Sequence, residues 1–217
     1  MLIDVSMPIK PGSVFRLGTP PVEVAARSFY HESEGQYESV MLSLSAHTAT
    51  HVDLVFRDKS IDLDRLIGTG KLIDATGLSA SEIGLRDVEG QVELHSGDFV
   101  FFRTDWSKSV DTDAYYRHPE LASDVVQWLI SKEVNAVGID ALGLGRDRKH
   151  GEYDRLLLKN DIFVIENLTN LAAIPRSEFR VYCFPLNIQN IDAIPARVVV
   201  EVDDDTGTNS TYLEAMA

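Results

Sequence analysis

The chain has 217 residues, of which 44% are hydrophobic, and its 34 acidic and 20 basic residues give a net charge of −14. This length can bury a sizeable core, and we expect a single domain over residues 1–217. The negative charge repels phosphate backbones and anionic lipids, so neither nucleic-acid nor membrane partners are expected. One cysteine excludes an internal disulfide framework. With no leader-like or membrane-spanning apolar run in the sequence, we expect a soluble, cytoplasmic protein.

The first third of the chain is interrupted by Gly and Pro, which favours extended structure over helix. From Val40 the residues alternate, with Val40, Leu42 and Leu44 on an apolar side and His47 on the polar side, which is typical of a half-buried strand. Further along, short apolar runs predict buried strands at residues 98–103, 136–140, 161–166, 181–188 and 196–202.

Helices fit best between these strands. Apolar residues recur at three- and four-residue spacing over residues 121–129, and residues 153–159 form a shorter candidate. Strands that alternate with helices predict an α/β domain with a mixed sheet.

Two histidines and a carboxylate lie close together at His47, His51 and Asp53. On an extended chain these residues and Arg57 project to the same side. Two imidazole nitrogens and a carboxylate oxygen suit Zn²⁺ or Mn²⁺ and leave coordination positions open for water, which favours catalysis over structural support. The alternative is that the two histidines only form hydrogen bonds with their neighbours, and the spacing alone leaves both interpretations open.

The stretch from His47 to Arg57 resembles the signature His-x-Gly-Thr-His-x-Asp-x-Pro-x-His of the cyclase family of metal-dependent hydrolases, which includes bacterial kynurenine formamidases and isatin hydrolases. Both early histidines, the threonine and the aspartate match, whereas Ala49, Val55 and Arg57 stand where the family has Gly, Pro and His. Further similar blocks follow in the family's order, at residues 3–6, 18–21, 103–106, 137–140, 165–171 and 192–197. The resemblance covers essentially the whole chain.

The resemblance implies a single-domain α/β fold with a mixed, curved β-sheet flanked by helices, in a homodimer or homotetramer. It also implies hydrolysis of a small-molecule amide or lactam by metal-bound water, with one divalent metal, Zn or Mn, on His47, His51 and Asp53. Where members have a second metal, it shares the aspartate and adds two histidines and a glutamate. Here only the glutamate remains, as Glu166, because Arg57 and Asp154 stand in the histidine positions.

These departures suggest that the second metal has been replaced. Keeping Glu166 beside Asp53 without a cation costs several kcal/mol unless the carboxylate protonates or finds a partner. The guanidinium of Arg57 can take two carboxylates, so it could form an ion cluster with Asp154 and Glu166. The alternative is that Arg57 faces solvent and Asp154 is an ordinary acid of a helix's first turn. His150 is then either a proton donor or a loop histidine.

The sequence therefore predicts a metal-dependent hydrolase that acts on C–N bonds in a small amide, lactam or lactone, similar to arylformamidases. Glu166, Arg57 and Asp154 are the candidate catalytic residues around the single metal. Because the family's proton-handling histidines are absent, we expect weaker activity than in a member that has them. The alternative is a weak or inactive binding protein on the same scaffold, with the Arg57–Asp154–Glu166 ion cluster in place of the second metal.

Overall fold

The interior strands of the molecule are short apolar runs that lie parallel to one another. The computed structural model describes residues 1–54, 61–78 and 82–203. In it, β5 Ile67–Asp74 pairs with β7 Phe99–Arg103, β7 pairs with β9 Ala136–Ile139, and β9 pairs with β10 Phe163–Glu166. Parallel strands are covered on both faces, which explains why all of β9 and β10 are buried.

Antiparallel strands close the sheet on itself. The order is β12 Ala193–Glu201, β11 Glu178–Pro185, β5, β7, β9, β10 and β4 His51–Asp53, and β4 also pairs with β12. These seven strands form a mixed barrel, with β1 Leu2–Asp4 paired to the far part of β12. The predicted single α/β domain with a mixed sheet is confirmed, and the expected curvature of the sheet goes as far as closure into a barrel, which the sequence did not predict. Closure depends on β4, a three-residue strand that pairs on both edges.

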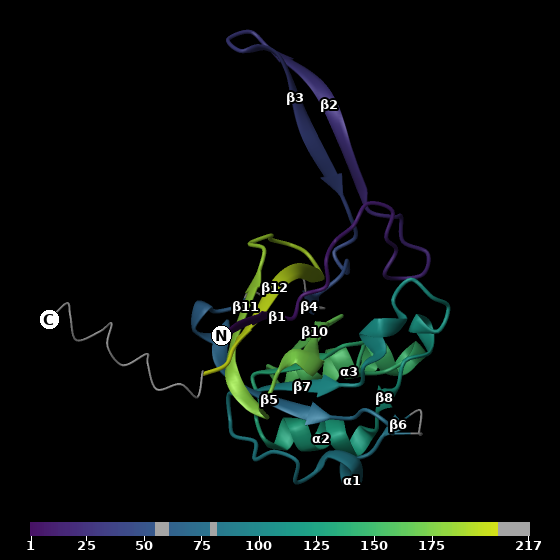
Figure 1. Cartoon of the computed structure of the whole chain (residues 1–217), viewed down its shortest axis with the longest axis vertical. Helices are drawn as coiled ribbons and strands as arrows, with labels where there is room; N and C mark the ends of the chain where they lie inside the picture. Colours follow the sequence, from purple (N-terminus) through teal and green to yellow (C-terminus); the bar gives the residue numbers. More distant parts are fainter. Residues whose placement is uncertain (55–60, 79–81, 204–217) are drawn as a thin grey trace, which may run out of the picture.

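The helices cover one side of the barrel (Figure 1). Helix α2 Ser123–Ser131 buries Val125, Val126 and Leu129, and α3 Asp147–Lys159 packs against β10. The first predicted helix is confirmed with shifted ends, whereas the second begins six residues earlier than expected. No described helix is long and apolar enough to cross a membrane. The remaining short elements are α1 Leu85–Val88, the pair β6 Glu82–Ile83 and β8 Glu120–Leu121, and the 3-10 turns Leu63–Arg65, Trp106–Ser109, Tyr115–Arg117 and Leu171–Ala173.

Apolar residues form two layers of core. Along β7, Phe101 belongs to the layer inside the barrel, whereas Phe102 belongs to the layer between barrel and helices. The same alternation holds in β4, where Val52 belongs to the inner layer. His51 and Asp53, on either side of Val52, therefore point out of the barrel, toward the helix side.

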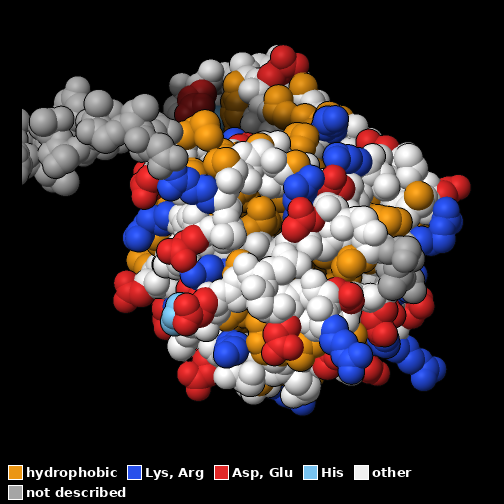
Figure 2. Space-filling model, turned by 60° about the horizontal axis from the view of Figure 1, so that its bottom comes forward, with side chains coloured by type: hydrophobic (Ala, Val, Ile, Leu, Met, Phe, Trp, Pro, Cys, Tyr) orange, Lys and Arg blue, Asp and Glu red, His pale blue; other side chains and the backbone are white. Residues whose placement is uncertain are grey.

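A long two-stranded arm projects from the body (Figure 1). It consists of β2 Glu23–His31 and β3 Gly35–Ser43, which among the described residues pair only with each other. The apolar side predicted to be buried from Val40 onward is not buried, because Val40 is 64% and Leu42 56% exposed. In the body, Figure 2 shows acidic and basic side chains interspersed with small apolar areas on the face that it presents.

Candidate metal centre

Strands β4 and β10 place three ionisable side chains on the outside of the barrel wall. His51 and Asp53 are two residues apart in β4, so they share a face, and Glu166 lies directly opposite His51 in the antiparallel register. All three are buried, with His51 fully inaccessible. His51 Nε2 lies 3.3 Å from Glu166 Oε2 and 3.6 Å from Asp53 Oδ1.

His47 reaches the same point from a turn, which corrects the expectation that it shares a strand with His51. Strand β3 ends at Ser43, and residues 46–50 turn before β4 begins. Ala49 has a left-handed backbone with φ 53°, a conformation that favours glycine and that explains why the family signature has Gly at this position. The turn brings His47 Nδ1 to 3.2 Å from His51 Nε2 and 3.0 Å from Asp53 Oδ1.

These three donor atoms have the spacing of a metal site. Ligands held about 2.0–2.1 Å from a tetrahedral Zn²⁺ lie roughly 3.4 Å from one another, which matches the 3.0–3.6 Å separations between His47, His51 and Asp53. The tautomer of His51 also fits, because its Nδ1 lies 2.9 Å from the Ala49 carbonyl oxygen, which can only accept a hydrogen bond. A neutral His51 therefore presents the lone pair of Nε2 to the cluster.

Helix α3 adds two more side chains. His150 and Asp154 are four residues apart and lie on one face of the helix, beside Asp53 and Glu166. His150 Nε2 is 3.6 Å from Asp154 Oδ2, and His150 Nδ1 is 3.7 Å from Glu166 Oε1. Ligand atoms of these four residues all lie within 4.8 Å of one another.

Several carboxylate oxygens in the centre are buried without a hydrogen-bond partner among the described residues. They are both oxygens of Asp53, Oδ1 of Asp154 and Oε1 of Glu166. A buried ionised oxygen without a partner is costly, so orphaned oxygens of this kind indicate a cation that the described residues do not supply. The residues present therefore fit a divalent cation.

Proton affinities in the centre follow from burial and from the proximity of the carboxylates. Burial disfavours the charged form of His51, but its contacts with Asp53 and Glu166 outweigh burial and raise the pKa of His51 to about 10. Burial and the charges of neighbouring carboxylates raise the pKa of both Asp154 and Glu166. Burial would also raise the pKa of Asp53, but its contacts with His47 and His51 lower it. Without a cation the centre therefore holds protons that a cation would displace.

Two polar side chains outside the centre fix the turn that carries His47. Thr50 Oγ1 accepts a hydrogen bond from the Met7 amide at 2.7 Å and donates one to the Asn167 carbonyl oxygen at 2.5 Å. Asn167 Nδ2 donates to the Ala49 carbonyl oxygen at 3.0 Å, and its Oδ1 accepts from the Tyr115 hydroxyl. The carbonyl that orients His51 is thus itself held in place by Asn167.

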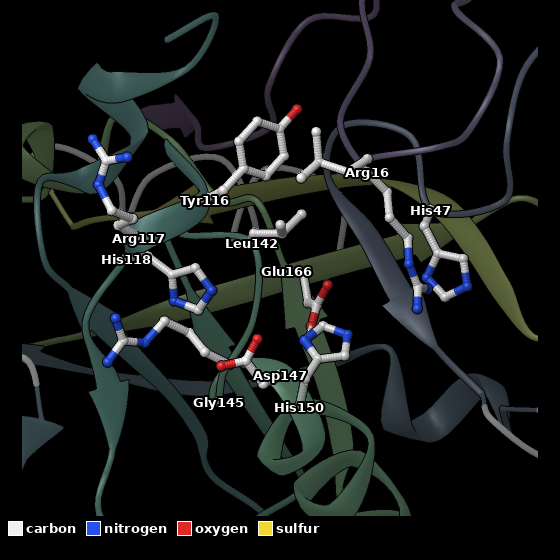
Figure 3. A pocket seen from close by; sticks show the side chains of 12 residues that line it. Arg16, His47, Tyr116, Arg117, His118, Leu142, Gly145, Asp147, His150 and Glu166 are labelled. Atoms are coloured by element: carbon white, nitrogen blue, oxygen red, sulfur yellow. Dashed lines mark ion pairs between the residues drawn. The ribbon is translucent and has the colours of Figure 1, made fainter. Parts of the chain in front are cut away.

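The centre opens into a pocket of about 460 Å³, a size that suits a small molecule. In Figure 3, Arg16 and His47 lie on one side of this pocket, Arg117 and His118 lie on the other, and His150 and Glu166 lie between them. Tyr116 provides an aromatic wall, and Arg146 adds a third guanidinium to the lining.

The structure places most of the predicted residues in one centre. His47, His51 and Asp53 converge, and Asp154 and Glu166 belong to the adjoining group. Arg57 lies outside the described residues, so its ion cluster with Asp154 and Glu166 stays a prediction. His150 belongs to the adjoining group as well, and the sequence interpretation left it as a possible loop residue. The signal that could have identified it is the four-residue spacing to Asp154 on a helix that begins at Asp147 instead of residue 153.

A comparison with protein families identifies the scaffold. The Cyclase family model matches residues 3–146, a segment that contains His47, His51 and Asp53. The chain belongs to the Cyclase family. His150, Asp154 and Glu166 come after the matched segment.

Curated relatives and solved structures agree with this family. A kynurenine formamidase of Bacillus cereus is 27% identical over 208 residues, which cover 91% of this chain and 96% of that protein. A kynurenine formamidase of Salinibacter ruber is 27% identical over 207 residues, with 92% and 96% covered. The structure of a predicted metal-dependent hydrolase from Bacillus stearothermophilus matches with a TM-score of 0.76 at 26% identity, over 92% of this chain and 97% of that one. An isatin hydrolase bound to the product analogue thioisatinate matches in fold, with a TM-score of 0.77 at 22% identity over 94% and 92% of the chains.

Proposed function

We propose that this chain is a metal-dependent hydrolase that cleaves the C–N bond of a small aryl formamide or lactam. The observation that carries this proposal is the convergence of His47 Nδ1, His51 Nε2 and Asp53 Oδ1 at the separations of a metal's ligands. The kynurenine formamidases among its relatives and the similarity to isatin hydrolase support the substrate class.

The residues around this first cluster divide the work. His47, His51 and Asp53 would hold the cation, and the Ala49 carbonyl oxygen, 2.9 Å from His51 Nδ1, keeps the His51 ring in the orientation that presents Nε2. When bound, a divalent cation would supply Lewis acidity, which activates water and polarises a carbonyl group. Glu166 Oε2 adjoins the first cluster at 3.3 Å from His51 Nε2, where it can accept the proton of the attacking water and pass it to the leaving nitrogen.

The lining of the pocket favours a substrate with a negative charge. Arg16 and Arg117 are exposed in the pocket wall, and among the described residues neither guanidinium has a carboxylate within ion-pair distance. Arg146 lies 3.7 Å from Glu120, but its buried Nε makes no hydrogen bond with a described residue. Three guanidiniums at one pocket of a protein with net charge −14 support a carboxylate on the substrate.

Hydrolysis of defined formamides tests the function. We expect the zinc- or manganese-loaded protein to hydrolyse 2-formamidobenzoate with a lower KM than uncharged formanilide, and Arg117→Gln to narrow that difference. Activity should be lost with a chelator and restored by added metal. His51→Ala should abolish both metal binding and activity, whereas His95→Ala, which changes an exposed histidine outside the pocket, should alter neither.

The contrary result is clear. The metal-loaded protein should hydrolyse at least one of three substrates: the formamides named above, kynurenine-type formamides or isatin. If it hydrolyses none of them, the hydrolase proposal is wrong for this substrate class. Metal binding without any turnover would support the alternative of a binding protein on the same scaffold.

A further inference from the structure

We propose that a second divalent cation binds between Asp53, His150, Asp154 and Glu166, in a site that this chain assembles from helix α3. The proposal rests on the proposed function, because the second cation would share Asp53 with the first. It differs from what the family resemblance implies, since both histidines expected at a second metal are missing. Arg57 and Asp154 stand in those two sequence positions, and His150, one helical turn before Asp154, supplies an imidazole instead. A cation here would replace the predicted ion cluster of Arg57 with Asp154 and Glu166.

Helix geometry places these two side chains. Residues four apart in a helix lie one above the other, so His150 and Asp154 project from the same face of α3. That face packs against β10, which carries Glu166. Asp154 is buried among the apolar residues Leu157 and Leu158 of the same face, where an aspartate has no packing advantage.

The distances favour an ion between these groups over hydrogen bonds among them. His150 lies 3.6 Å from Asp154 and 3.7 Å from Glu166, longer than the roughly 2.7–3.2 Å of hydrogen bonds. The atoms facing this gap include Asp154 Oδ1 and Glu166 Oε1, which are buried and have no partner among the described residues. Glu166 can serve both sites, with Oε1 toward His150 and Oε2 toward His51.

The balance of charge supports the same conclusion. Asp53, Asp154 and Glu166 are three buried acidic side chains whose ligand atoms lie within 4.8 Å of one another. Buried acidic groups this close together are unfavourable unless a cation lies between them. A second divalent cation neutralises them and supplies the orphaned oxygens with a partner.

Gly143 indicates that the position of His150 is built into the fold. A Cβ atom at residue 143 would lie 2.3 Å from His150 Nδ1 and 2.9 Å from Glu166 Oε1, closer than real Cβ atoms approach. The absence of a side chain at this residue therefore gives His150 the space to lie beside Glu166. A loop histidine that only visited the pocket would need no such space.

The donor set indicates which cation the second site prefers. Three carboxylates and one imidazole form a harder, more oxygen-rich site than the two imidazoles and one carboxylate of the first cluster. Such a set suits Mn²⁺ better than Zn²⁺. We therefore expect the two positions to differ in metal preference, with Mn²⁺ favoured at the second.

Manganese stoichiometry tests the proposal without measuring activity. The full chain is stripped with chelator, loaded with Mn²⁺ and freed of unbound metal, and its manganese content is measured beside its electron paramagnetic resonance spectrum. We expect two Mn²⁺ per chain and a spin-coupled spectrum, because metal ions that share a carboxylate lie about 3.5–4 Å apart. His150→Gln and Asp154→Asn should each reduce the content to one Mn²⁺ per chain with a single-ion spectrum.

His118→Gln is the matched control. It also changes a pocket histidine, but His118 Nδ1 donates to the Pro119 carbonyl oxygen and takes no part in the cluster, so two Mn²⁺ should remain. Thermal melts show whether each variant is folded. If either His150→Gln or Asp154→Asn fails to fold, the manganese content of the other variant tests the proposal. One Mn²⁺ in the unmodified chain, removed by His51→Ala, would overturn the second site and leave the proposed function standing. No bound metal at all would contradict both, and two Mn²⁺ in His150→Gln and Asp154→Asn would place the second ion elsewhere.

Discussion

Adding a single methyl group at residue 143 should prevent metal binding at the second position and leave the first position intact. Gly143→Ala places a Cβ within 2.3 Å of His150 Nδ1 without removing any ligand. We expect the second Mn²⁺ to be lost and the first to be retained, with a stability loss of about 1–3 kcal/mol from overpacking. Manganese content and chemical denaturation measure the two effects. Gly84→Ala is the control, because its Cβ meets only the flexible carboxylate of Asp87; two Mn²⁺ in Gly143→Ala would show that His150 is not needed.

The stability of the metal-free protein should fall as pH rises. His51 is faced by Asp53, Glu166 and His47, and its pKa of about 10 lies above the ordinary value near 6.5. The folded state therefore binds this proton more tightly than the unfolded state, and the stabilisation is lost between about pH 6.5 and 10. The raised pKa values of Asp154 and Glu166 also make the folded state less stable as pH rises, from about pH 4 upward. The lowered pKa of Asp53 has the opposite effect on stability, and only below that pH range.

Thermal melts from pH 6 to 9 test this linkage. The Tm of chelator-treated protein should decrease across this range, and the increase in Tm caused by added Zn²⁺ should become larger as pH rises, because the cation replaces protons. A Zn²⁺ effect that is independent of pH would show that no proton of the centre is displaced on binding.

At the scale of elements, the connection from β10 to the turn before β4 should control metal affinity. Asn167→Ala removes the hydrogen bond to the Ala49 carbonyl oxygen, and with it the support of the group that orients His51. Losing such outer contacts typically weakens metal binding about 10–100-fold. Zn²⁺ titration with a competing chelator measures this loss. Asn160→Ala is the control, because its amide only caps the end of α3 at Leu156; equal affinities in the two variants would show that Asn167 has no such role.

The elements also show where sequence reasoning succeeds. Continuous apolar runs predict the buried strands β7, β9 and β10 because a strand covered on both faces leaves no room for polar residues. The first cluster was predictable because its three ligands lie within seven residues of sequence. The strand predicted from Val40 onward is present as the end of β3, but its predicted burial is wrong. Alternation distinguishes the two faces of a strand and does not show whether the rest of the protein covers either face.

The second cluster was harder to predict, since it depends on where α3 begins. The first turns of α3 contain no apolar residues at helical spacing, because His150 is flanked by Arg148, Lys149 and Gly151. The sequence pattern therefore predicts a loop there and does not place His150 in the helix. The closure of the barrel could not be predicted from the three residues of β4 either. This strand pairs with β10 and β12, and both lie far from it in the sequence. Long-range pairing of this kind has no local pattern.

At the scale of the whole molecule, the arm exposes apolar side chains that a partner surface could cover. An isolated two-stranded hairpin is marginally stable at best in water, and the arm exposes Val40, Leu42 and the 75% exposed Tyr30. A second copy of this chain is present wherever the chain itself is, so it can cover these exposed apolar side chains. About 20 residues on each side make a protein–protein interface of standard size. We therefore expect a homodimer or homotetramer assembled through the arms.

Analytical ultracentrifugation measures the oligomeric state and so tests this prediction. The double variant Val40→Glu, Leu42→Glu should dissociate the oligomer into monomers while β4 and the metal centre remain folded. Leu63→Glu changes a leucine that is 80% exposed on the body and should leave the oligomer intact. An unmodified chain that sediments as a monomer would show that the arm serves another purpose.

The most direct test of the central claim is an anomalous difference map from crystals of the zinc-loaded protein. The account predicts a zinc peak in contact with His47 Nδ1, His51 Nε2 and Asp53 Oδ1, at coordination distances of about 2.0–2.2 Å. A fully loaded crystal with no peak between these three residues, or with zinc bound only elsewhere, would contradict it.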